Sequence, residues 1–443
     1  MSDQESIPSS KLSRIASLAG AGARVGVNYL KHYGKRAITG NTDQTALHEQ
    51  NASDVYDTFS KLKGGPLKLA QMLSIDKNLL PPAYAREFAQ AQYSAPPLSY
   101  PLVVRTFRRE FGKSPTEIFE TFTSSAVHGA SIGQVHRATL DGKDYAVKVQ
   151  YPGVAESIKS DLNFVKPVAL QIMGLKESQV APYIAEVEKR LLEETNYTLE
   201  LERSIELSRR SGHLRNVRFP IYYPEYSSSR VLTLDWIDGV TLDKFADSDA
   251  SQEARDGIGQ ALWDFYEHQI HVLHIFHADP HPGNFLVKDN QLWVIDFGCT
   301  KKIEEDFYRK HFRFLDPALT EDWQLLEEAL TDLGVFRPSD TAEIRQNVLE
   351  LCAESIQIFS RPFRQGNFDF GDPTFMRAIY ELGDTSRRND DFRKMEGARG
   401  SADGVYTNRA YFGLYSLLAR LRSRVETRLP DWLQPQTSEA GLA

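Results

Sequence analysis

The sequence stretch that decides the fold is HADPHPGNF, from His277 to Phe285, followed by VIDFG, from Val294 to Gly298. An acid, Asp279, stands five positions before an amide, Asn284, and a second acid, Asp296, follows the apolar residues of VIDFG. Transfer of a phosphoryl group needs a carboxylate near the incoming hydroxyl and hard oxygen ligands for Mg²⁺. The stretch therefore predicts a phosphoryl-transfer site, with Asp279 as base and with Asn284 and Asp296 as metal ligands.

The loop between the acid and the amide is expected to be stiff. Pro280, Pro282 and Gly283 cannot extend a helix, so the two functional side chains are placed on a constrained loop. This spacing is that of the catalytic loop of protein kinases, in which Asp-Phe-Gly supplies a further metal ligand. The alternative is an ordinary turn and a chance tripeptide, because short motifs often occur by accident.

Length and composition set bounds on the answer. A chain of 443 residues that is 41% hydrophobic can bury a large core and has room for two or three domains or lobes. The net charge of −8 argues against a nucleic-acid binder, whose surface is usually basic. Two cysteines, Cys299 and Cys352, suit a reducing compartment and exclude a multi-cysteine zinc site. A catalytic metal would therefore be held by oxygen.

The first 50 residues form a leader whose most regular part runs from Leu12 to Ala37. Its apolar run is short and contains Arg24, so it cannot span a bilayer unaided, and no cleavable signal pattern is present. Small residues at Gly22 and Gly26, with basic residues after them, suit a helix on an anionic membrane surface or against a partner. The alternative is a flexible leader that packs on the domain. We expect a cytoplasmic or matrix-like reducing compartment, peripheral membrane contact and no transmembrane helix.

The next part, residues 51–115, has a helical pattern and contains KLKGGPLKLAQMLSID, from Lys61 to Asp76. Leu67 and Gln71 share one face of the predicted helix. Lys68 lies on a different side, where a lysine is by default a solvated surface charge. On residue pattern alone, this helix carries no assigned chemistry.

The unit from Ile118 to Tyr151 changes to the alternation of β-strands. SIGQVHRATL and DYAVKVQY flank an Asp141-Gly142 turn and predict a hairpin. Lys148 stands between two valines on the second strand, which is unusual unless the lysine meets an anion. Its functional interpretation is the strand lysine that contacts the α- and β-phosphates of a nucleotide.

A phosphate-binding loop is expected just before these strands. The chain has no GxGxxG there, but HGASIGQ places small residues at Gly129, Ala130 and Ser131. Small side chains let backbone N–H groups approach a phosphate, although the missing glycines make this pattern weak by itself.

The charged stretch from Ala181 to Arg210 is expected to supply a helix glutamate that pairs with Lys148. It offers several candidates. Residues 195–198 are poor helix formers, so the stretch can be two helices with Asn196 capping the second. In a single helix, Glu194 and Glu200 would lie about 120° apart and face different partners.

A strand and turn follow in VLTLDWIDGV, which ends at Val240. Between the charged stretch and the catalytic loop, this segment would be a hinge that places Asp235 to Ile237 near an adenine ring. After Gly298 the sequence is expected to be helical, with loops at 361–374 and 387–404.

Five parts follow one another in the order of a protein kinase: the strand lysine, the helix glutamate, the hinge strand, the loop with Asp279 and Asn284, and Asp-Phe-Gly. This order favours a nucleotide site over chance. The chain resembles the UbiB/ADCK (AarF) family of atypical protein-kinase-like proteins. The segments that carry the resemblance are LKLAQMLSID, GASIGQVHRA, AVKVQYPGV, ETNYTLE, ADPHPGN and DFG. It is most similar to the branch tied to ubiquinone biosynthesis. The resemblance runs from about Lys61 to the end of the helical lobe.

The resemblance implies roles that the residue pattern alone does not. The family's KxGQ motif falls on Lys68 to Gln71, with Ala70 in place of the glycine. In the family this helical extension folds over the active site, its lysine meets an ExD motif, and the space for a peptide substrate is occluded. The ExD acids fall on Glu194 and Asn196, so a neutral amide replaces the second carboxylate.

Other family positions are matched more closely. The alanine-rich loop that replaces a glycine-rich loop falls on residues 128–131, and two of its three alanines are changed. Glu200 matches the helix glutamate that pairs with Lys148. Asp279, Asn284 and Asp296 match the catalytic acid and the metal ligands without departure.

We therefore predict an α+β, two-lobed protein-kinase-like fold with an N-terminal helical extension, a smaller lobe over residues 116–238 and a large helical lobe over 239–443. The activity implied is a Mg-dependent ATPase that supports isoprenoid-quinone (ubiquinone) biosynthesis, with ATP and Mg²⁺ as cofactors. Quinone-biosynthesis proteins and isoprenoid lipid precursors are the implied partners. Two alternatives stay open: a true Ser/Thr protein kinase, and a non-catalytic, nucleotide-gated lipid-binding scaffold.

Overall fold

The structure is a computed structural model that describes residues 20, 24, 27, 28, 45–62, 83, 87, 98–130, 132–173, 185, 188–388 and 399–434. Lys68, Gln71 and Ser131, which the sequence assigns to the site, lie outside the described residues. The chain divides into two compact units. The first holds the described residues up to Arg209 with Pro220–Asp238 and Phe297–Cys299, and the second holds Arg210–Phe219, Gly239–Asp296 and the chain from Thr300 onward.

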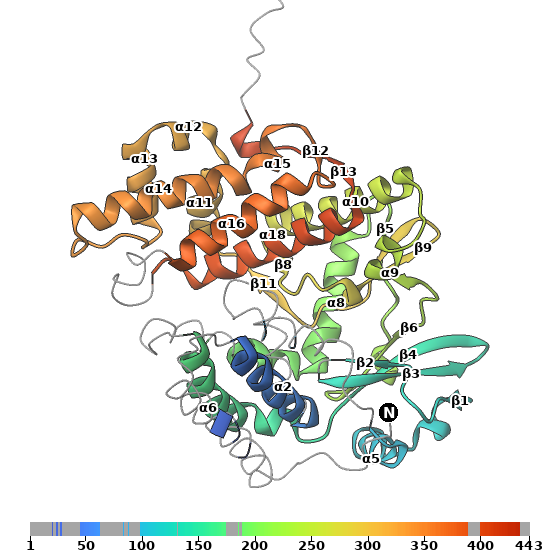
Figure 1. Ribbon diagram of the computed structural model, residues 1–443. Helices are drawn as coiled ribbons and strands as arrows, with labels where there is room; N and C mark the ends of the chain where they lie inside the picture. Colours follow the sequence, from blue (N-terminus) through green and yellow to red (C-terminus); the bar gives the residue numbers. More distant parts are fainter. Residues whose placement is uncertain are drawn as a thin grey trace, which may run out of the picture. The chain divides into compact units, whose positions relative to one another are not determined.

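The first unit is built on an antiparallel sheet (Figure 1). Its strands run in the order β1-β3-β4-β6, and β2 pairs with β3 beside this path. The strands are β1 (Thr121–Phe122), β2 (His128–Gly129), β3 (Gly133–Leu140), β4 (Lys143–Gln150) and β6 (Val231–Asp235). The helices are α2 (Thr45–Leu62), α5 (Tyr100–Phe111), α6 (Val154–Met173) and α8 (Tyr197–Ser211), whose last two residues belong to the second unit, and short 3₁₀ turns lie at Pro115–Glu117 and Pro224–Tyr226.

The predicted hairpin is confirmed. Strands β3 and β4 pair antiparallel from Gly133↔Gln150 to Leu140↔Lys143. Asp141 and Gly142 have φ angles of 51° and 72°, so both central residues of the two-residue turn are left-handed, as a tight hairpin prefers. The register places Lys148 opposite Leu232 of β6, and therefore on the same face of the sheet as that leucine.

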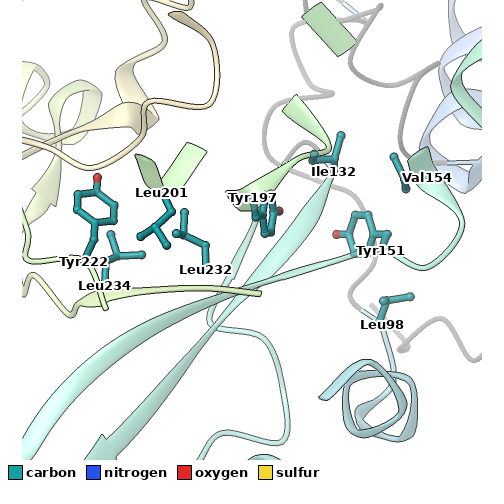
Figure 2. Close-up of a cluster of buried hydrophobic side chains, with 9 residues drawn as sticks. All are labelled: Leu98, Ile132, Tyr151, Val154, Tyr197, Leu201, Tyr222, Leu232 and Leu234. Atoms are coloured by element: carbon teal, nitrogen blue, oxygen red, sulfur yellow. The ribbon is translucent and has the colours of Figure 1, made fainter. Parts of the chain in front are cut away.

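The two faces of this sheet carry different apolar clusters. Val147 and Val149 of β4 pack with residues of α5 such as Val103 and Phe107. The opposite face, which carries Lys148, packs against α8 through Tyr197 and Leu201 (Figure 2). The lysine therefore stands at the edge of an apolar cluster on the α8 side.

The second unit is mainly helical, with three small sheets. One sheet has the order β5-β10-β9-β7, with β5 parallel to β10 and the other pairs antiparallel; β11 pairs with β8, and β12 pairs with β13. The strands are β5 (Val217–Arg218), β7 (Val240–Thr241), β8 (Ile275–His277), β9 (Phe285–Lys288), β10 (Gln291–Val294), β11 (Thr300–Lys302), β12 (Asn367–Asp369) and β13 (Arg424–Glu426).

Helices form the rest of this unit, and Figure 1 shows α14, α16 and α18 lying beside one another. The α-helices are α9 (Leu242–Ala246), α10 (Gln252–Glu267), α11 (Glu305–Phe312), α12 (Pro317–Glu321), α13 (Trp323–Asp332), α14 (Ala342–Phe359), α15 (Arg361–Arg364), α16 (Pro373–Arg388) and α18 (Ala402–Leu421). A π-helical turn at His268–Leu273 continues α10, and short 3₁₀ turns lie at Pro282–Asn284, Arg313–Leu315 and Asp431–Leu433.

The sequence prediction was wrong about the segment 361–374. It expected a loop there, but the segment contains α15 and β12, and β12 pairs with β13 beyond α18. A strand of three residues shows too little alternation to be recognised, and its partner lies more than fifty positions away. Such pairing depends on tertiary packing.

The fold class is α+β, as predicted, with antiparallel sheets in the first unit and a mainly helical C-terminal region. The proposed division into four segments at residues 50, 115 and 238 stays a prediction. Among the described residues, no helix is both long enough and apolar enough to cross a bilayer.

We predict that Gly133→Ala destabilises the protein and that Gly129→Ala does not. A Cβ at Gly133 would lie 2.6 Å from Val149 O and 2.7 Å from Tyr197 Oη, whereas a Cβ at Gly129 would meet nothing within 4 Å. We expect the first change to lower the melting temperature by at least about 3 °C relative to the second. Equal melting temperatures in a thermal unfolding experiment would contradict this account of β3.

Candidate functional site

Lys148 and Glu200 form a buried ion pair in the first unit. Strand β4 supplies the lysine and the first turn of α8 supplies the glutamate, with 2.8 Å between Lys148 Nζ and Glu200 Oε1. The lysine side chain is 11% exposed and the glutamate side chain 2%. The expected contact is therefore present.

The other candidate glutamates have different partners. Glu188 lies 3.9 Å from Lys159, and Glu193 Oε2 accepts hydrogen bonds from Arg190 and Arg203, each at 3.0 Å. This leaves Glu200 as the acid that the sequence register assigned to Lys148.

Tyr197 is a site residue that the sequence analysis missed. It is fully buried, and Lys148 Nζ lies 5.1 Å from the centre of its ring, within the range of a cation–π interaction. Tyr197 stands three positions before Glu200, so both face the lysine from one side of α8. That spacing is the signal from which it could have been recognised.

Asn196 caps α8, which confirms the expectation that the charged stretch breaks into two helices. Residues 188–194 are helical, and α8 begins at Tyr197. Asn196 Oδ1 accepts a hydrogen bond from the Leu199 N–H at 3.2 Å, the usual N-cap contact. Glu194 is 8% exposed, whereas Asn196 is exposed. The amide that replaces the family's second acid therefore has a structural task that an aspartate would also perform.

Backbone hydrogen bonds join Ala130 of the predicted phosphate loop to Gly133. Ala130 N–H donates to Gly133 O at 2.9 Å, and Gly133 N–H donates back to Ala130 O at 3.4 Å. A phosphate that used the Ala130 N–H would have to open the first of these bonds. The role of Gly129 and Ala130 stays a prediction.

The side chain of Asp235 is engaged away from Lys148. It lies opposite Tyr145 in the sheet, on the other face from Lys148 and Leu232. Its carboxylate is 2.9 Å from Lys143 Nζ and accepts hydrogen bonds from Tyr223 Oη at 2.7 Å and Ile221 N–H at 2.9 Å.

This network changes what the hinge prediction can mean. Hydrogen bonds with Tyr223 and then Asp235 raise the pKa of Lys143, which stabilises its charged form beside the carboxylate. The Asp235 carboxylate is therefore already engaged, and the Asp235 N–H donates to Ile221 O. The nucleotide contact itself stays a prediction.

The catalytic-loop sequence in the second unit is held by its own backbone. His281 N–H donates to Asp279 O at 2.7 Å, and Asn284 N–H donates to His281 O at 3.0 Å. The two prolines and the glycine prevent a longer helix but allow one 3₁₀ turn at Pro282–Asn284. Ile295 N–H donates to Asn284 O at 3.1 Å, so the loop is tied to the residue before Asp296.

The orientation of Asn284 fits its predicted role as a metal ligand. Its Nδ2 donates to Asp279 O at 3.0 Å. A backbone carbonyl can only accept, so the amide nitrogen and not the amide oxygen faces it. This places the amide oxygen on the other branch of the side chain, where it can act as a hard ligand. Among the described residues, no three His, Cys, Asp or Glu side chains gather around a point. Mg²⁺ needs few protein ligands, because phosphate and water complete its octahedron.

His277 joins the two acidic segments and was missing from the predicted site. Its Nε2 donates to Asp296 O at 2.8 Å, so its Nδ1 can accept from Asp279 N–H, 3.3 Å away. Its own N–H donates to Gln269 Oε1 at 2.9 Å, and its side chain is fully buried. One imidazole therefore bridges the main chain at Asp279 and Asp296. Its place two residues before Asp279 was the available signal.

Helix α18 also contacts the catalytic loop. Arg409 Nη2 lies 3.8 Å from Asp279 Oδ1. Four residues later, Gly413 packs so closely that a Cβ there would lie 2.0 Å from Pro280 Cγ. Both residues are some 130 positions beyond the loop, so no local pattern could have revealed them.

Comparison with known proteins decides the family. The sequence profile of the ABC1 atypical kinase-like domain matches residues 90–330, more than half of the chain. The chain belongs to this family. The predicted kinase-like fold and the UbiB/ADCK resemblance are thereby confirmed, and this chain is an atypical kinase-like protein.

Several curated relatives are similar over most of this chain. A probable serine/threonine-protein kinase, abkA of Dictyostelium discoideum, is 26% identical over 96% of this chain and 79% of its own length. The mitochondrial atypical kinase COQ8 of Saccharomyces cerevisiae is 27% identical over 95% of this chain and 84% of its own. The mitochondrial COQ8B of Danio rerio is 27% identical, and the match covers 86% of this chain and 62% of that relative.

A solved structure shares the fold. It is the complex of Rv3197 with erythromycin from Mycobacterium tuberculosis, with a TM-score of 0.60 and 24% sequence identity. The match covers 88% of this chain and 99% of that one. At this identity the likeness concerns the fold alone.

We predict that Gly413→Ala loosens α18 from the catalytic loop. The new methyl group would overlap Pro280, so the helix or the loop must move, and we expect a lower melting temperature. Gly404→Ala is the matched control on the same helix, because its Cβ would make an ordinary contact 3.8 Å from Phe307 Cε2. The control should gain up to about 1 kcal/mol of helix propensity. Equal melting temperatures for the two variants would refute the close approach.

Proposed function

We propose that this chain is a Mg-dependent ATPase of the atypical kinase class that supports isoprenoid-quinone (ubiquinone) biosynthesis at a membrane surface. The observation that carries the proposal is the buried ion pair between Lys148 and Glu200. A lysine held in this way on a β-strand is the phosphate-contacting group of protein kinases. Its presence supports nucleotide binding.

The geometry around several of the side chains supports the roles proposed for them. Lys148, fixed by Glu200 and by the ring of Tyr197, donates to the α- and β-phosphate oxygens. Asn284 Oδ1 and the Asp296 carboxylate hold the metal, and His277 fixes the spacing of the main chain at Asp279 and Asp296. Asp279 accepts the proton of the attacking water or hydroxyl. When bound, Mg²⁺ supplies charge neutralisation at the phosphates.

The link to quinone biosynthesis rests on the family branch that the motifs resemble and on similarity to relatives named COQ8. Quinone-biosynthesis proteins and isoprenoid lipid precursors are the partners we propose. The membrane contact is assigned to the leader, whose predicted helix over residues 12–37 falls almost entirely outside the described residues.

A second candidate is a true Ser/Thr protein kinase, in which Asp279 takes the proton of a protein hydroxyl. The intact Asp279, Asn284 and Asp296, and the Lys148–Glu200 pair, favour it. The family's KxGQ extension, matched at Lys68 and Gln71, disfavours it because that extension occludes a peptide site. Measuring phosphate release and protein labelling from γ-labelled ATP distinguishes the two functions. If neither product forms, the nucleotide-gated scaffold is the remaining alternative.

We predict that Asp296→Asn removes most of the stabilisation by Mg-ATP. The substitution keeps the shape of the side chain but removes the formal charge that holds the metal. For the parent, Mg-ATP at a hundred times its dissociation constant should stabilise the fold by about 2.7 kcal/mol. Asp289→Asn is the matched control, because Asp289 is exposed in the turn between β9 and β10, where asparagine also tolerates its φ of 52°. Equal thermal shifts in parent and Asp296→Asn would disprove the metal assignment.

We also predict that Lys68→Ala shifts the products from released phosphate towards self-phosphorylation. In the proposed arrangement the lysine blocks the approach of a hydroxyl to Asp279, so its removal opens the site. The shift should be smaller than in a relative with both ExD acids, because Asn196 carries no charge for the lysine to meet. Unchanged labelling of the variant and of the parent by γ-labelled ATP would exclude this role for Lys68.

A further inference from the structure

Asp279 receives its cation from a distant helix. The sequence contains no Lys or Arg between Asp256 and Val287, so the catalytic loop and the strand before it, β8, have no lysine or arginine of their own. Arg409 of α18 lies 3.8 Å from Asp279 Oδ1, and the two side chains are 10% and 17% exposed. A charge pair so sheltered from water interacts more strongly than one on the surface.

The face of α18 that carries Arg409 is fixed on both sides of it. Tyr406, Arg409 and Gly413 are spaced three and four positions apart, so they share one face of the helix. Before Arg409, Lys301 of β11 forms an ion pair with Asp403 at 2.7 Å, and its Nζ lies 5.3 Å from the centre of the Tyr406 ring. After Arg409, Gly413 meets Pro280.

A second contact joins the same helix to the segment that precedes β8. Tyr411 Oη donates to Glu267 Oε1 at 3.1 Å and also lies 3.1 Å from His271 Nε2. Glu267 ends α10, and His271 lies in the π-helical turn before β8. The placement of Arg409 is therefore set by packing on both sides of the catalytic loop and is unlike that of a loose surface arginine.

We propose that Arg409 is a positioning residue that holds the Asp279 carboxylate and offsets its charge next to the transferred phosphoryl group. This inference rests on the proposed function. A separation of 3.8 Å is an ion pair rather than a short hydrogen bond, so the carboxylate keeps its capacity to accept a proton. Loss of the guanidinium would remove a positive charge from beside a sheltered carboxylate that a phosphate must also approach.

The first part of the test uses the full-length protein without nucleotide. Melting temperatures are measured for the parent, Arg409→Met, Asp279→Asn and the double variant. We expect the effect of Arg409→Met to differ by about 2 °C or more between the two backgrounds, because the pair couples the residues. Arg420→Met is the matched control: it removes a cation from the same helix, where Arg420 pairs with Asp247 in an exposed ion pair. Its effect should be equal in both backgrounds, and equal effects of Arg409→Met would overturn the proposal.

The second part measures ATP hydrolysis in the same set of variants. We expect Arg409→Met to lower kcat about tenfold or more and to change KM for ATP less than about twofold, with part of the loss recovered in Arg409→Lys. In the Asp279→Asn background, Arg409→Met should cause no further loss beyond about twofold.

Two other results would lead to different conclusions, one about the positioning role and one about the proposed function. An increase in KM that persists in the Asp279→Asn background would show that Arg409 binds the nucleotide directly, and would overturn the positioning role. A parent protein that hydrolyses no ATP would refute the proposed function. The melting experiment would then decide, without any nucleotide, whether Arg409 holds Asp279.

Discussion

The pairing of Lys148 with Glu200 constrains the first unit more than any other contact. Two charges that are almost fully removed from water are stable only when each meets the other in good geometry, so β4 and α8 cannot slide past one another without a large loss. This fixes where α8 begins and explains the cap at Asn196. It also places Tyr197 under the lysine and brings its hydroxyl against Gly133, where only a glycine fits.

In the second unit, contacts from residues outside the catalytic loop help to hold the loop in place. The prolines of the loop cannot donate backbone hydrogen bonds and limit its helix to one 3₁₀ turn. Residues elsewhere in the fold therefore add to the contacts that the loop makes within itself. His277 bonds to the main chain at Asp279 and Asp296, and Pro280 meets a glycine of α18. In both units buried polar contacts are accompanied by a glycine that permits a close approach: Gly133 beside Tyr197, and Gly413 beside Pro280.

The sequence was informative where function depends on neighbours along the chain. The β3–β4 hairpin and the cap at Asn196 could be read from local spacing, and the family resemblance pointed to Glu200 among several glutamates; the structure has each of them. Tyr197 was overlooked because only the glutamates of this stretch were considered as partners of Lys148. Arg409 and the β12–β13 pairing could not be predicted, since their partners are brought near only by the packing of α18.

Because Arg409 lies on α18 and not in the catalytic loop, activity depends on the packing of that helix. A cation within the catalytic loop would stay beside Asp279 as long as the loop itself was formed. A cation carried by α18 stays there only while this helix is packed against β11, the end of α10 and the loop, through Asp403, Tyr411 and Gly413. Local opening of a helix needs less free energy than unfolding of the whole protein. The charge at Asp279 is therefore coupled to the packing of the C-terminal helix, and loss of that packing would disable the acid before the rest of the fold is lost.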